Sequence, residues 1–222
     1  MPLSVAIIGA GPLGRRLAWR AARAGFRVSL EDVLPSNLEH AREAIRRDFT
    51  AVPQLPNLGA SEAEWLFHQE KATSNFAGNR SRELWNRSRA ESLAEIAGGG
   101  IRFVSSIEDA AREADLAIDC VPDELESKLE ILWLLYRMAP PRTVFATPTT
   151  NLSIADLGAC TYRADKCIAI AASPAELADL AANPTAEIRL RAASVTAAET
   201  IAVVEQFWRS LGCSVRIERA IE

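Results

Sequence analysis

Hydrophobic positions follow two patterns that alternate along the chain. Short runs rich in Val, Ile and Ala are typical of buried strands, and longer stretches with apolar residues every three or four positions are typical of amphipathic helices. The first pattern predicts strands at residues 4–8, 26–30, 101–104, 115–121, 143–146, 167–172 and 214–217. The second predicts helices at residues 12–24, 34–49, 107–113, 123–138 and 197–211. Strands that alternate with helices at this spacing predict an α/β fold, a Rossmann-type doubly wound and mainly parallel sheet.

Three stretches depart from this rhythm. Residues 61–72 and 80–97 read as helices with no strand between them, so the stretch of about 50–97 is interpreted as a helical insertion. In residues 188–191, Ile and Leu alternate with Arg, which indicates a half-exposed or edge strand. Residues 131–136 are apolar nearly all round the helix. Such a helix is deeply buried or shared with a partner subunit, and burial against the sheet is the preferred interpretation.

Composition narrows the class of protein. The 222 residues suit one domain spanning 1–222, and 49% hydrophobic against 24% charged residues exclude wholesale disorder. The net charge of −4 argues against a nucleic-acid or anionic-membrane partner, each of which needs a basic face. No apolar run approaches the roughly 18 residues that span a bilayer, and the N-terminus lacks a signal-peptide pattern. Four cysteines without a C-x-x-C pair and only two histidines predict a cytoplasmic protein with reduced thiols and no histidine-based metal site.

A glycine-rich motif stands between the first predicted strand and helix. Residues 9–14 read Gly9-Ala10-Gly11-Pro12-Leu13-Gly14, a G-x-G-x-x-G. Its first glycine permits the tight turn, the second lets a pyrophosphate approach the backbone, and the third permits close helix packing, while the helix N-terminus faces the phosphates. The alternative is a tight strand–helix turn without a ligand.

An acidic residue stands at the end of the second strand. Asp32 lies 18 residues after Gly14, where a carboxylate can accept both ribose hydroxyls of NAD and repel the extra phosphate of NADP. Val33 and Leu34 follow, with no Arg at the usual place for a 2′-phosphate. The predicted cofactor is therefore NAD.

Two further segments carry a family resemblance. Residues 115–130 read DLAIDCVPDELESKLE and residues 143–152 read TVFATPTTNL. Together with the glycine motif and Asp32, they resemble the NAD-binding domain of the 3-hydroxyacyl-CoA dehydrogenases, whose segments read D-L-V-V-E-A-V-x-E-x-L-x-x-K-x-E and T-I-F-A-S-N-T-S-S-L. Residues 196–212 resemble the last helix of that domain, so the resemblance covers the chain except for about 50–95. It implies an oxidoreductase that acts on 3-hydroxyacyl groups with NAD, of the kind used in fatty-acid metabolism.

The resemblance assigns three further residues. Asp123 matches a family glutamate and Lys128 a family lysine, both on the nicotinamide-ribose side, and Thr147 matches a serine at the substrate hydroxyl. Each has a structural alternative. Asp123 can be a first-turn acid that favours the helix dipole, and Lys128 can pair with Glu124 on an exposed helix face. Thr147 can be a strand-end hydroxyl.

The chain also departs from the family pattern. The family's catalytic histidine falls on Ile170 or Ala171, depending on the placement of one gap, and neither side chain transfers a proton. The glutamate that orients that histidine falls on Arg189, and two family asparagines become Ser173 and Pro148. His40 and His68 lie in predicted helices, where histidines are usually packed or surface residues.

The family's NAD-binding unit is followed by a helical domain that completes the acyl-CoA site, and no such domain is expected in residues 1–222. Three hypotheses follow. The chain is a dehydrogenase with altered chemistry, a non-catalytic NAD(H) sensor, scaffold or subunit, or a domain that works through protein contacts alone. The partners considered are the dinucleotide, an acyl-CoA or other small substrate, and a second copy or another subunit. Loss of the histidine predicts that the isolated chain is weak or inactive, since a positioned base contributes about 10²–10⁴-fold in rate.

Overall fold

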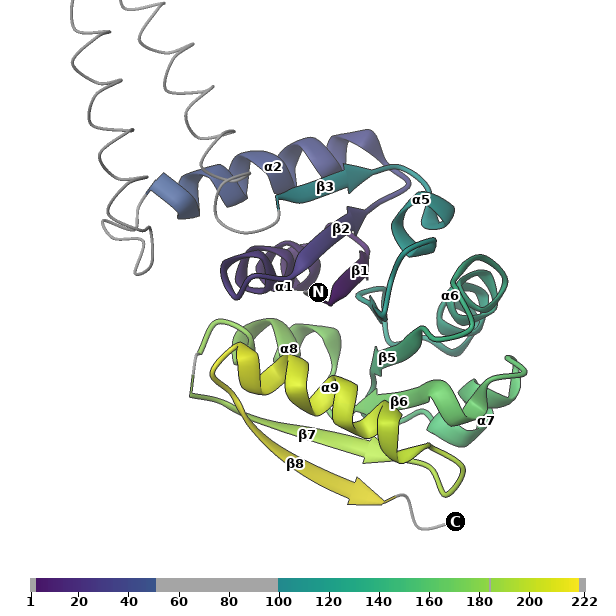
Figure 1. The fold of residues 1–222 in the computed structure, drawn as a ribbon. Helices are drawn as coiled ribbons and strands as arrows, with labels where there is room; N and C mark the ends of the chain where they lie inside the picture. Colours follow the sequence, from purple (N-terminus) through teal and green to yellow (C-terminus); the bar gives the residue numbers. More distant parts are fainter. Residues whose placement is uncertain (1–2, 51–99, 184, 220–222) are drawn as a thin grey trace, which may run out of the picture.

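The computed structural model describes residues 3–50, 100–183 and 185–219 (Figure 1). The helices expected at 61–72 and 80–97, and His68, lie outside these ranges. The described chain forms one eight-stranded sheet in the order β3-β2-β1-β4-β5-β6-β7-β8. Its strands are β1 Ser4–Ile8, β2 Arg27–Glu31, β3 Ile101–Val104, β4 Leu116–Asp119, β5 Val144–Pro148, β6 Cys167–Ile170, β7 Glu187–Ala192 and β8 Ser214–Arg219.

All neighbouring strands run parallel except β6 and β7. The register pairs Ile8 with Glu31 of β2 and with Asp119 of β4. The carboxyl ends of these three strands therefore lie level at one edge of the sheet. In doubly wound sheets this edge, where the strand order turns back at β1 and β4, is where ligands bind.

Helices cover both faces of the sheet. The described helices are α1 Pro12–Arg23, α2 Pro35–Thr50, α5 Ile107–Ala111, α6 Leu125–Met138, α7 Ile154–Ala159, α8 Pro174–Leu180 and α9 Ala198–Ser210, with the 3₁₀ turn η1 Ala164–Lys166. One buried cluster joins α1, α2, α8 and α9 to the sheet, and a second joins α5, α6 and α7 to the opposite face. Successive strand residues point to opposite faces, and because both faces are covered, β1, β4, β5 and β6 are buried at every position.

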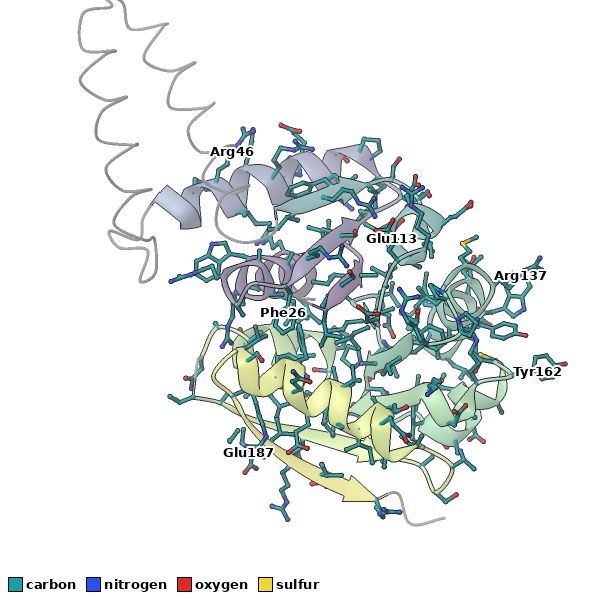
Figure 2. The ribbon with its side chains drawn as sticks, in the orientation of Figure 1. Phe26, Arg46, Glu113, Arg137, Tyr162 and Glu187 are labelled. Atoms are coloured by element: carbon teal, nitrogen blue, oxygen red, sulfur yellow. The ribbon has the colours of Figure 1, made fainter. Side chains whose placement is uncertain are left out.

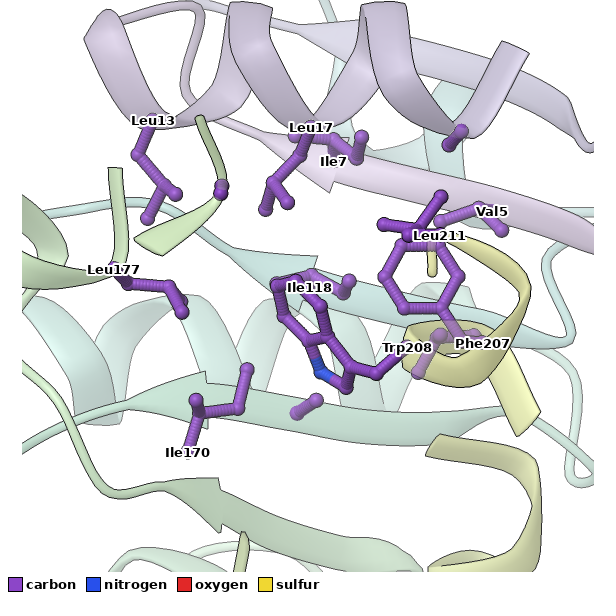
Figure 3. Packing of buried hydrophobic residues seen from close by; sticks show 14 of the residues in the cluster. Val5, Ile7, Leu13, Leu17, Ile118, Ile170, Leu177, Phe207, Trp208 and Leu211 are labelled. Carbon is purple, nitrogen blue, oxygen red and sulfur yellow. The ribbon is translucent and has the colours of Figure 1, made fainter. Parts of the chain in front are cut away.

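Aromatic residues fill the first cluster. Figure 3 shows Phe207 and Trp208 of α9 between the sheet and α1, and both side chains are fully buried. Phe207 also lies 5.3 Å from Phe26, between ring centroids. Truncation of such residues to Ala typically costs about 3–5 kcal/mol. The α9 helix is therefore an integral part of the core.

The predicted fold class is confirmed, and the predicted ends of strands and helices differ from the observed ends by at most two residues. Of the two interpretations of residues 188–191, the half-exposed strand is confirmed. The edge strand is wrong, because β7 lies between β6 and β8 and the edge of the described sheet is β8. The alternation in β7 has another cause. Ile188 and Leu190 pack in the core, whereas Glu187 and Arg189 lie on a face that is exposed, as Figure 2 shows for Glu187.

Three short elements were missed, namely α7, η1 and α8. The two helices carry sequence signals at their starts: Ser153 accepts a hydrogen bond from the Asp156 amide, and Ser173 forms a capping box with Glu176. A serine followed three residues later by an acid is the usual signature of a helix start. Their shortness, six and seven residues, left too few apolar positions for periodicity to reveal them.

The apolar segment of α6 is only partly buried. Leu132 and Leu135 pack against the sheet as expected, but Trp133 is 45% exposed. Arg137 lies over the Trp133 ring at 4.9 Å, and Figure 2 shows Arg137 at the outer surface of the helix. The all-round apolar pattern therefore combines a buried stripe with an exposed aromatic residue covered by a cation.

Candidate functional site

The glycine motif forms a tight turn at the carboxyl end of β1. Gly9 has φ +101°, a left-handed conformation that favours glycine, and its amide donates to the Glu31 carbonyl at 2.8 Å. A Cβ on Gly14 would lie 1.8 Å from the Gly9 carbonyl oxygen. Helix α1 therefore packs so closely on the turn that only glycine fits at position 14.

Gly11 differs from the other two glycines. A Cβ built on Gly11 meets no described atom within 4 Å, so nothing in the fold requires a glycine there. Gly11 is the N-cap of α1, no side chain caps the helix, and the first turn carries no acid. Open space beside uncapped helix amides is the arrangement that accepts a phosphate group. The loop thus fits a dinucleotide pyrophosphate on its geometry as well as on its sequence.

Asp32 is buried and braces this loop. Its Oδ2 accepts from the Ala10 amide at 2.9 Å, and its Oδ1 accepts from the Leu34 amide at 2.9 Å and from Asn37 Nδ2 at 3.1 Å. A carboxylate offers about four acceptor positions. Three are occupied by the protein, so the carboxylate is held rigidly with capacity left for a ligand hydroxyl. Sequence reasoning found the residue but not its bracing role.

Glu31 is a second buried acid beside Asp32. Burial, and then the neighbouring Asp32 charge, raise the pKa of Glu31 from 4.5 to about 7. Within the described part of the chain, its side chain makes no hydrogen bond or ion pair. Sequence reasoning assigned Glu31 no role. Its position directly after the predicted strand 26–30, beside a second acid, was the available signal.

A buried ion pair lies at the carboxyl ends of β4 and β5. Lys128 Nζ donates to Asp119 Oδ1 at 2.6 Å, and the two side chains are 0% and 1% exposed. The alternative that pairs Lys128 with Glu124 on an exposed face is therefore wrong. Lys128 lies on the face of α6 that meets the sheet, where the Asp119 carboxylate compensates its charge.

Thr147 lies beside this pair. Burial raises the pKa of Asp119, while Lys128, Thr147 and the Val121 backbone act in the opposite direction. Thr147 Oγ1 and Asp119 Oδ2 nevertheless make no hydrogen bond of standard geometry with described residues, although both atoms are buried. Thr147 therefore contacts the carboxylate without satisfying it. The sequence analysis missed Asp119, although a charged residue inside a predicted buried strand is itself a signal.

Asp123 joins two loops at the same edge. Its Oδ2 accepts from the Thr150 amide at 3.0 Å and from Thr150 Oγ1 at 3.4 Å, whereas its buried Oδ1 has no partner among the described residues. Helix α6 has Glu124 as its N-cap and begins at Leu125. Asp123 therefore stands before the helix, and its interpretation as a first-turn acid is wrong.

Three residues stand where the chain departs from the catalytic pattern of the family. Ile170 ends β6, Ala171 follows it, and Arg189 lies on β7. Ile170 points into the core cluster near Leu177 and Trp208, as Figure 3 shows. Ala171 lies opposite Arg189: its amide donates to the Arg189 carbonyl at 2.8 Å, and Arg189 Nη2 donates to the Ala171 carbonyl at 3.2 Å. Both Ile170 and Ala171 are at most 5% exposed.

Two other family positions have structural roles here. Ser173 caps α8, accepting from the Glu176 amide at 3.2 Å. Pro148 is buried at the end of β5.

The remaining candidates lie away from this edge or form no site. His40 is exposed on α2. The four cysteines form no disulfide, and burial raises the pKa of Cys167 to about 11. In residues 3–50, 100–183 and 185–219, no group of three His, Cys, Asp or Glu side chains is placed to bind a metal ion. No helix of those ranges has the length and apolar character needed to cross a membrane.

Comparison with known proteins places this geometry in a family. The family model for the NAD-binding domain of 3-hydroxyacyl-CoA dehydrogenase matches residues 4–84 and 62–215. The chain belongs to this family. Its cofactor is accordingly NAD, and the chain is an oxidoreductase-type NAD-binding domain with a Rossmann fold.

Individual relatives support the same assignment. The chain is 25% identical over 210 residues to 5-formyl-3-hydroxy-2-methylpyridine 4-carboxylate 5-dehydrogenase of Mesorhizobium japonicum, covering 94% of this chain and 55% of that protein. It is 25% identical over 164 residues to a probable 3-hydroxybutyryl-CoA dehydrogenase of Bacillus subtilis, covering 74% and 46%. The chain thus spans about half the length of these relatives.

Solved structures agree in fold. A diketoreductase structure matches with a TM-score of 0.66 at 25% identity, over 100% of this chain and 65% of that one. The (S)-3-hydroxybutyryl-CoA dehydrogenase of Ralstonia eutropha matches with a TM-score of 0.67 at 22% identity, over the same shares, and supports the fold alone.

Proposed function

We propose that this chain is an NAD(H)-binding protein of the 3-hydroxyacyl-CoA dehydrogenase type whose dehydrogenase activity is weak or absent when the chain acts alone. The proposal treats residues 1–222 as a single NAD-binding domain of a cytoplasmic protein. An acyl-CoA or another small hydroxyl-bearing molecule is the proposed substrate class, and fatty-acid metabolism the proposed setting.

The pyrophosphate end of the proposed site is the glycine motif, Gly9 to Gly14. Pro12 and Leu13 open α1 there, and Gly11 leaves free space beside the helix amides. Asp32 would accept one adenosine ribose hydroxyl through the acceptor position that its three protein donors leave. Its negative charge disfavours the 2′-phosphate of NADP.

The nicotinamide end of the proposed site is formed by Asp123, Lys128 and Thr147. Asp123 Oδ1 and Thr147 Oγ1 are buried acceptors without a described partner, and such atoms are costly unless a ligand or water satisfies them. Lys128 is fully buried against Asp119, so its proposed role is to hold this edge rather than to reach a substrate. When bound here, NAD supplies the acceptor for a hydride.

The observation that carries the low-activity proposal is the Ala171–Arg189 pair. The family chemistry uses a histidine oriented by a glutamate on the next strand, and these positions are neighbours on β6 and β7 here. Ala171 faces Arg189 whereas Ile170 faces the core, which supports Ala171 as the histidine position. A methyl group offers no proton acceptor where the reaction needs one.

The experiment combines binding with turnover on the purified chain. We expect micromolar NADH binding by calorimetry and, with acetoacetyl-CoA, NADH oxidation at least about 10²-fold below ordinary enzyme rates. Ala171→His with Arg189→Glu restores the family pair, and its matched control is Ala171→His alone, which leaves Arg189 beside the new side chain. A gain in rate that requires both changes supports the proposal. Ordinary enzyme rates in the unmodified chain would refute it.

The alternative is a non-catalytic NAD(H) sensor, scaffold or subunit. The same buried residues at the histidine position favour it, because they leave cofactor binding intact while removing the base. A substrate screen separates the two. Under the alternative, no 3-hydroxyacyl-CoA or related alcohol is oxidised by the chain at any concentration, although NADH binds.

A further inference from the structure

Among the residues that the structure describes, β8 ends the sheet with an unpaired edge. Figure 1 shows β8 at the outside of the sheet, and β7 is its neighbour in the described chain. The Ser214 amide donates to the Ala186 carbonyl at 3.0 Å, so the backbone groups of Ser214 point toward β7. Because alternate residues of a strand point the same way, those of Val215, Ile217 and Arg219 point outward. The backbone donors and acceptors of these three residues therefore have no partner within the described part of the chain.

The side chains of β8 divide between two faces. The register with β7 pairs Val215 with Ile188 and Ile217 with Leu190, which places both on the face covered by α9. Ile217 is nevertheless 41% exposed. Arg216 and Glu218 lie on the opposite, uncovered face.

The charges on that uncovered face are unpaired. Arg216 is registered with Arg189 of β7, a side chain of like charge, and Glu218 with Arg191. Neither Arg216 nor Glu218 forms an ion pair or side-chain hydrogen bond within residues 3–50, 100–183 and 185–219. The edge therefore combines free backbone groups with one exposed apolar residue flanked by two unpaired, opposite charges.

We propose that β8 pairs antiparallel with β8 of a second copy of this chain, about a two-fold axis that passes beside Ile217. The two Ile217 residues then exchange both backbone hydrogen bonds, and Val215 exchanges two more with the partner's Arg219. Arg216 lies opposite the partner's Glu218, and Glu218 opposite the partner's Arg216. These are non-hydrogen-bonded pairs, in which side chains approach most closely. The result is a continuous sheet of two copies.

The two neighbouring two-fold registers are unfavourable. An axis at Arg216 sets arginine against arginine, and an axis at Glu218 sets glutamate against glutamate, and like charges directly opposite are destabilising. A register shifted by one residue pairs an outward-pointing residue with an inward-pointing one, so the backbone hydrogen bonds are lost. Charged residues on an edge strand usually prevent pairing. Here the order Arg-Ile-Glu has the opposite effect, because in an antiparallel pair of two copies each arginine faces a glutamate.

The test is the oligomeric state of the full chain, measured by sedimentation velocity over a concentration series. We expect a dimer, and for Arg216→Glu or Glu218→Arg a rise of at least about tenfold in the dimer dissociation constant, because each places two like-charge pairs across the axis. The doubly exchanged chain, R216E with E218R, restores both pairs and should dimerise as the original does. An equimolar mixture of the two single variants should form a heterodimer, since all four facing charges then become opposite.

Arg137→Glu is the matched control, because it makes the same change of charge on α6, away from β8 (Figure 2). It should leave the dissociation constant unchanged. Circular dichroism checks that each variant is folded. A monomeric wild-type chain would overturn the proposal, and so would a dimer that both single variants leave intact. Weakening by the single variants without recovery in the double exchange would assign the edge to a different partner strand and also overturn it.

Discussion

The two polar groups at the carboxyl edge of the sheet are built differently. At β1 and β2, Asp32 is satisfied by three protein donors, and the open space lies beside Gly11. At β4 and β5, Asp119, Asp123 and Thr147 each keep a buried oxygen without a described partner, and Lys128 is sealed beneath α6. The first group is a rigid cradle whose hydrogen bonds are satisfied within the protein. The second group is charged and buried, and its oxygens lack partners among the described residues.

Because of this difference, cofactor binding and catalysis depend on different residues. The cradle depends on backbone conformation and on one carboxylate, and all of its parts are in place. The chemistry of the family depends on a histidine and a glutamate on neighbouring strands. The residues that we propose at those positions, Ala171 and Arg189, are joined only by backbone and guanidinium hydrogen bonds. Substitutions in the cradle can therefore alter cofactor binding independently of substitutions in the group at β4 and β5. The following variants test this independence.

Lys128→Met is expected to have the largest effect. It leaves Asp119 buried without its cation, and breaking a buried pair in this way costs about 3–5 kcal/mol of the free energy of unfolding. Because Lys128 is the main influence that lowers the pKa of Asp119, the variant should lose further stability as pH rises. Urea denaturation at acidic and neutral pH measures both effects. The double variant Asp119→Leu, Lys128→Met should recover most of the loss. If Lys128→Met is as stable as the original chain, Lys128 does not compensate the buried charge of Asp119.

Gly14→Ala and Gly11→Ala form a matched pair in the cradle. The Cβ at position 14 would clash with the Gly9 carbonyl oxygen at 1.8 Å, and such overpacking costs about 1–3 kcal/mol. The Cβ at position 11 enters open space. We expect Gly14→Ala to lose stability and NADH affinity together. Gly11→Ala should lose affinity with a smaller loss of stability, about 0.5–1 kcal/mol, because alanine is a poorer N-cap than glycine. Equal loss of stability in both variants would show that the space beside Gly11 is not reserved for a ligand.

Glu31→Gln should change the pH dependence of stability. The folded pKa of Glu31, about 7, exceeds its ordinary 4.5, so the folded state holds a proton that the unfolded chain releases. This contribution is complete below pH 4.5 and is lost as pH rises through about 7. Between pH 5.5 and 8 it amounts to about 2 kcal/mol at most. Chemical denaturation measures the free energy of unfolding at pH 5.5 and at pH 8. The fall between these two pH values should be smaller for Glu31→Gln than for the original chain. An identical fall in both would contradict the raised pKa.

Much of the fold was predictable because it rests on local patterns. Periodicity located all eight strands, and the glycine spacing located the turn whose backbone geometry the structure confirms. The position of β7 was not predictable, because alternation reports an uncovered face and cannot distinguish it from a sheet edge. The Asp119–Lys128 pair was also missed, since the two residues meet only when α6 packs on β4. Side-chain partners that depend on packing leave no signal in residue spacing.

The central claim is that the cradle binds NAD(H) through Asp32 whether or not the chain is catalytic. Calorimetric titration of the folded chain with NADH and NADPH, repeated on Asp32→Ala, tests it most directly. The account predicts micromolar binding of NADH and at least about tenfold weaker binding of NADPH. This is a difference of about 1.4 kcal/mol in the free energy of binding, and Asp32→Ala should make that difference smaller. Absence of heat with either nucleotide, from a chain shown to be folded, would contradict it.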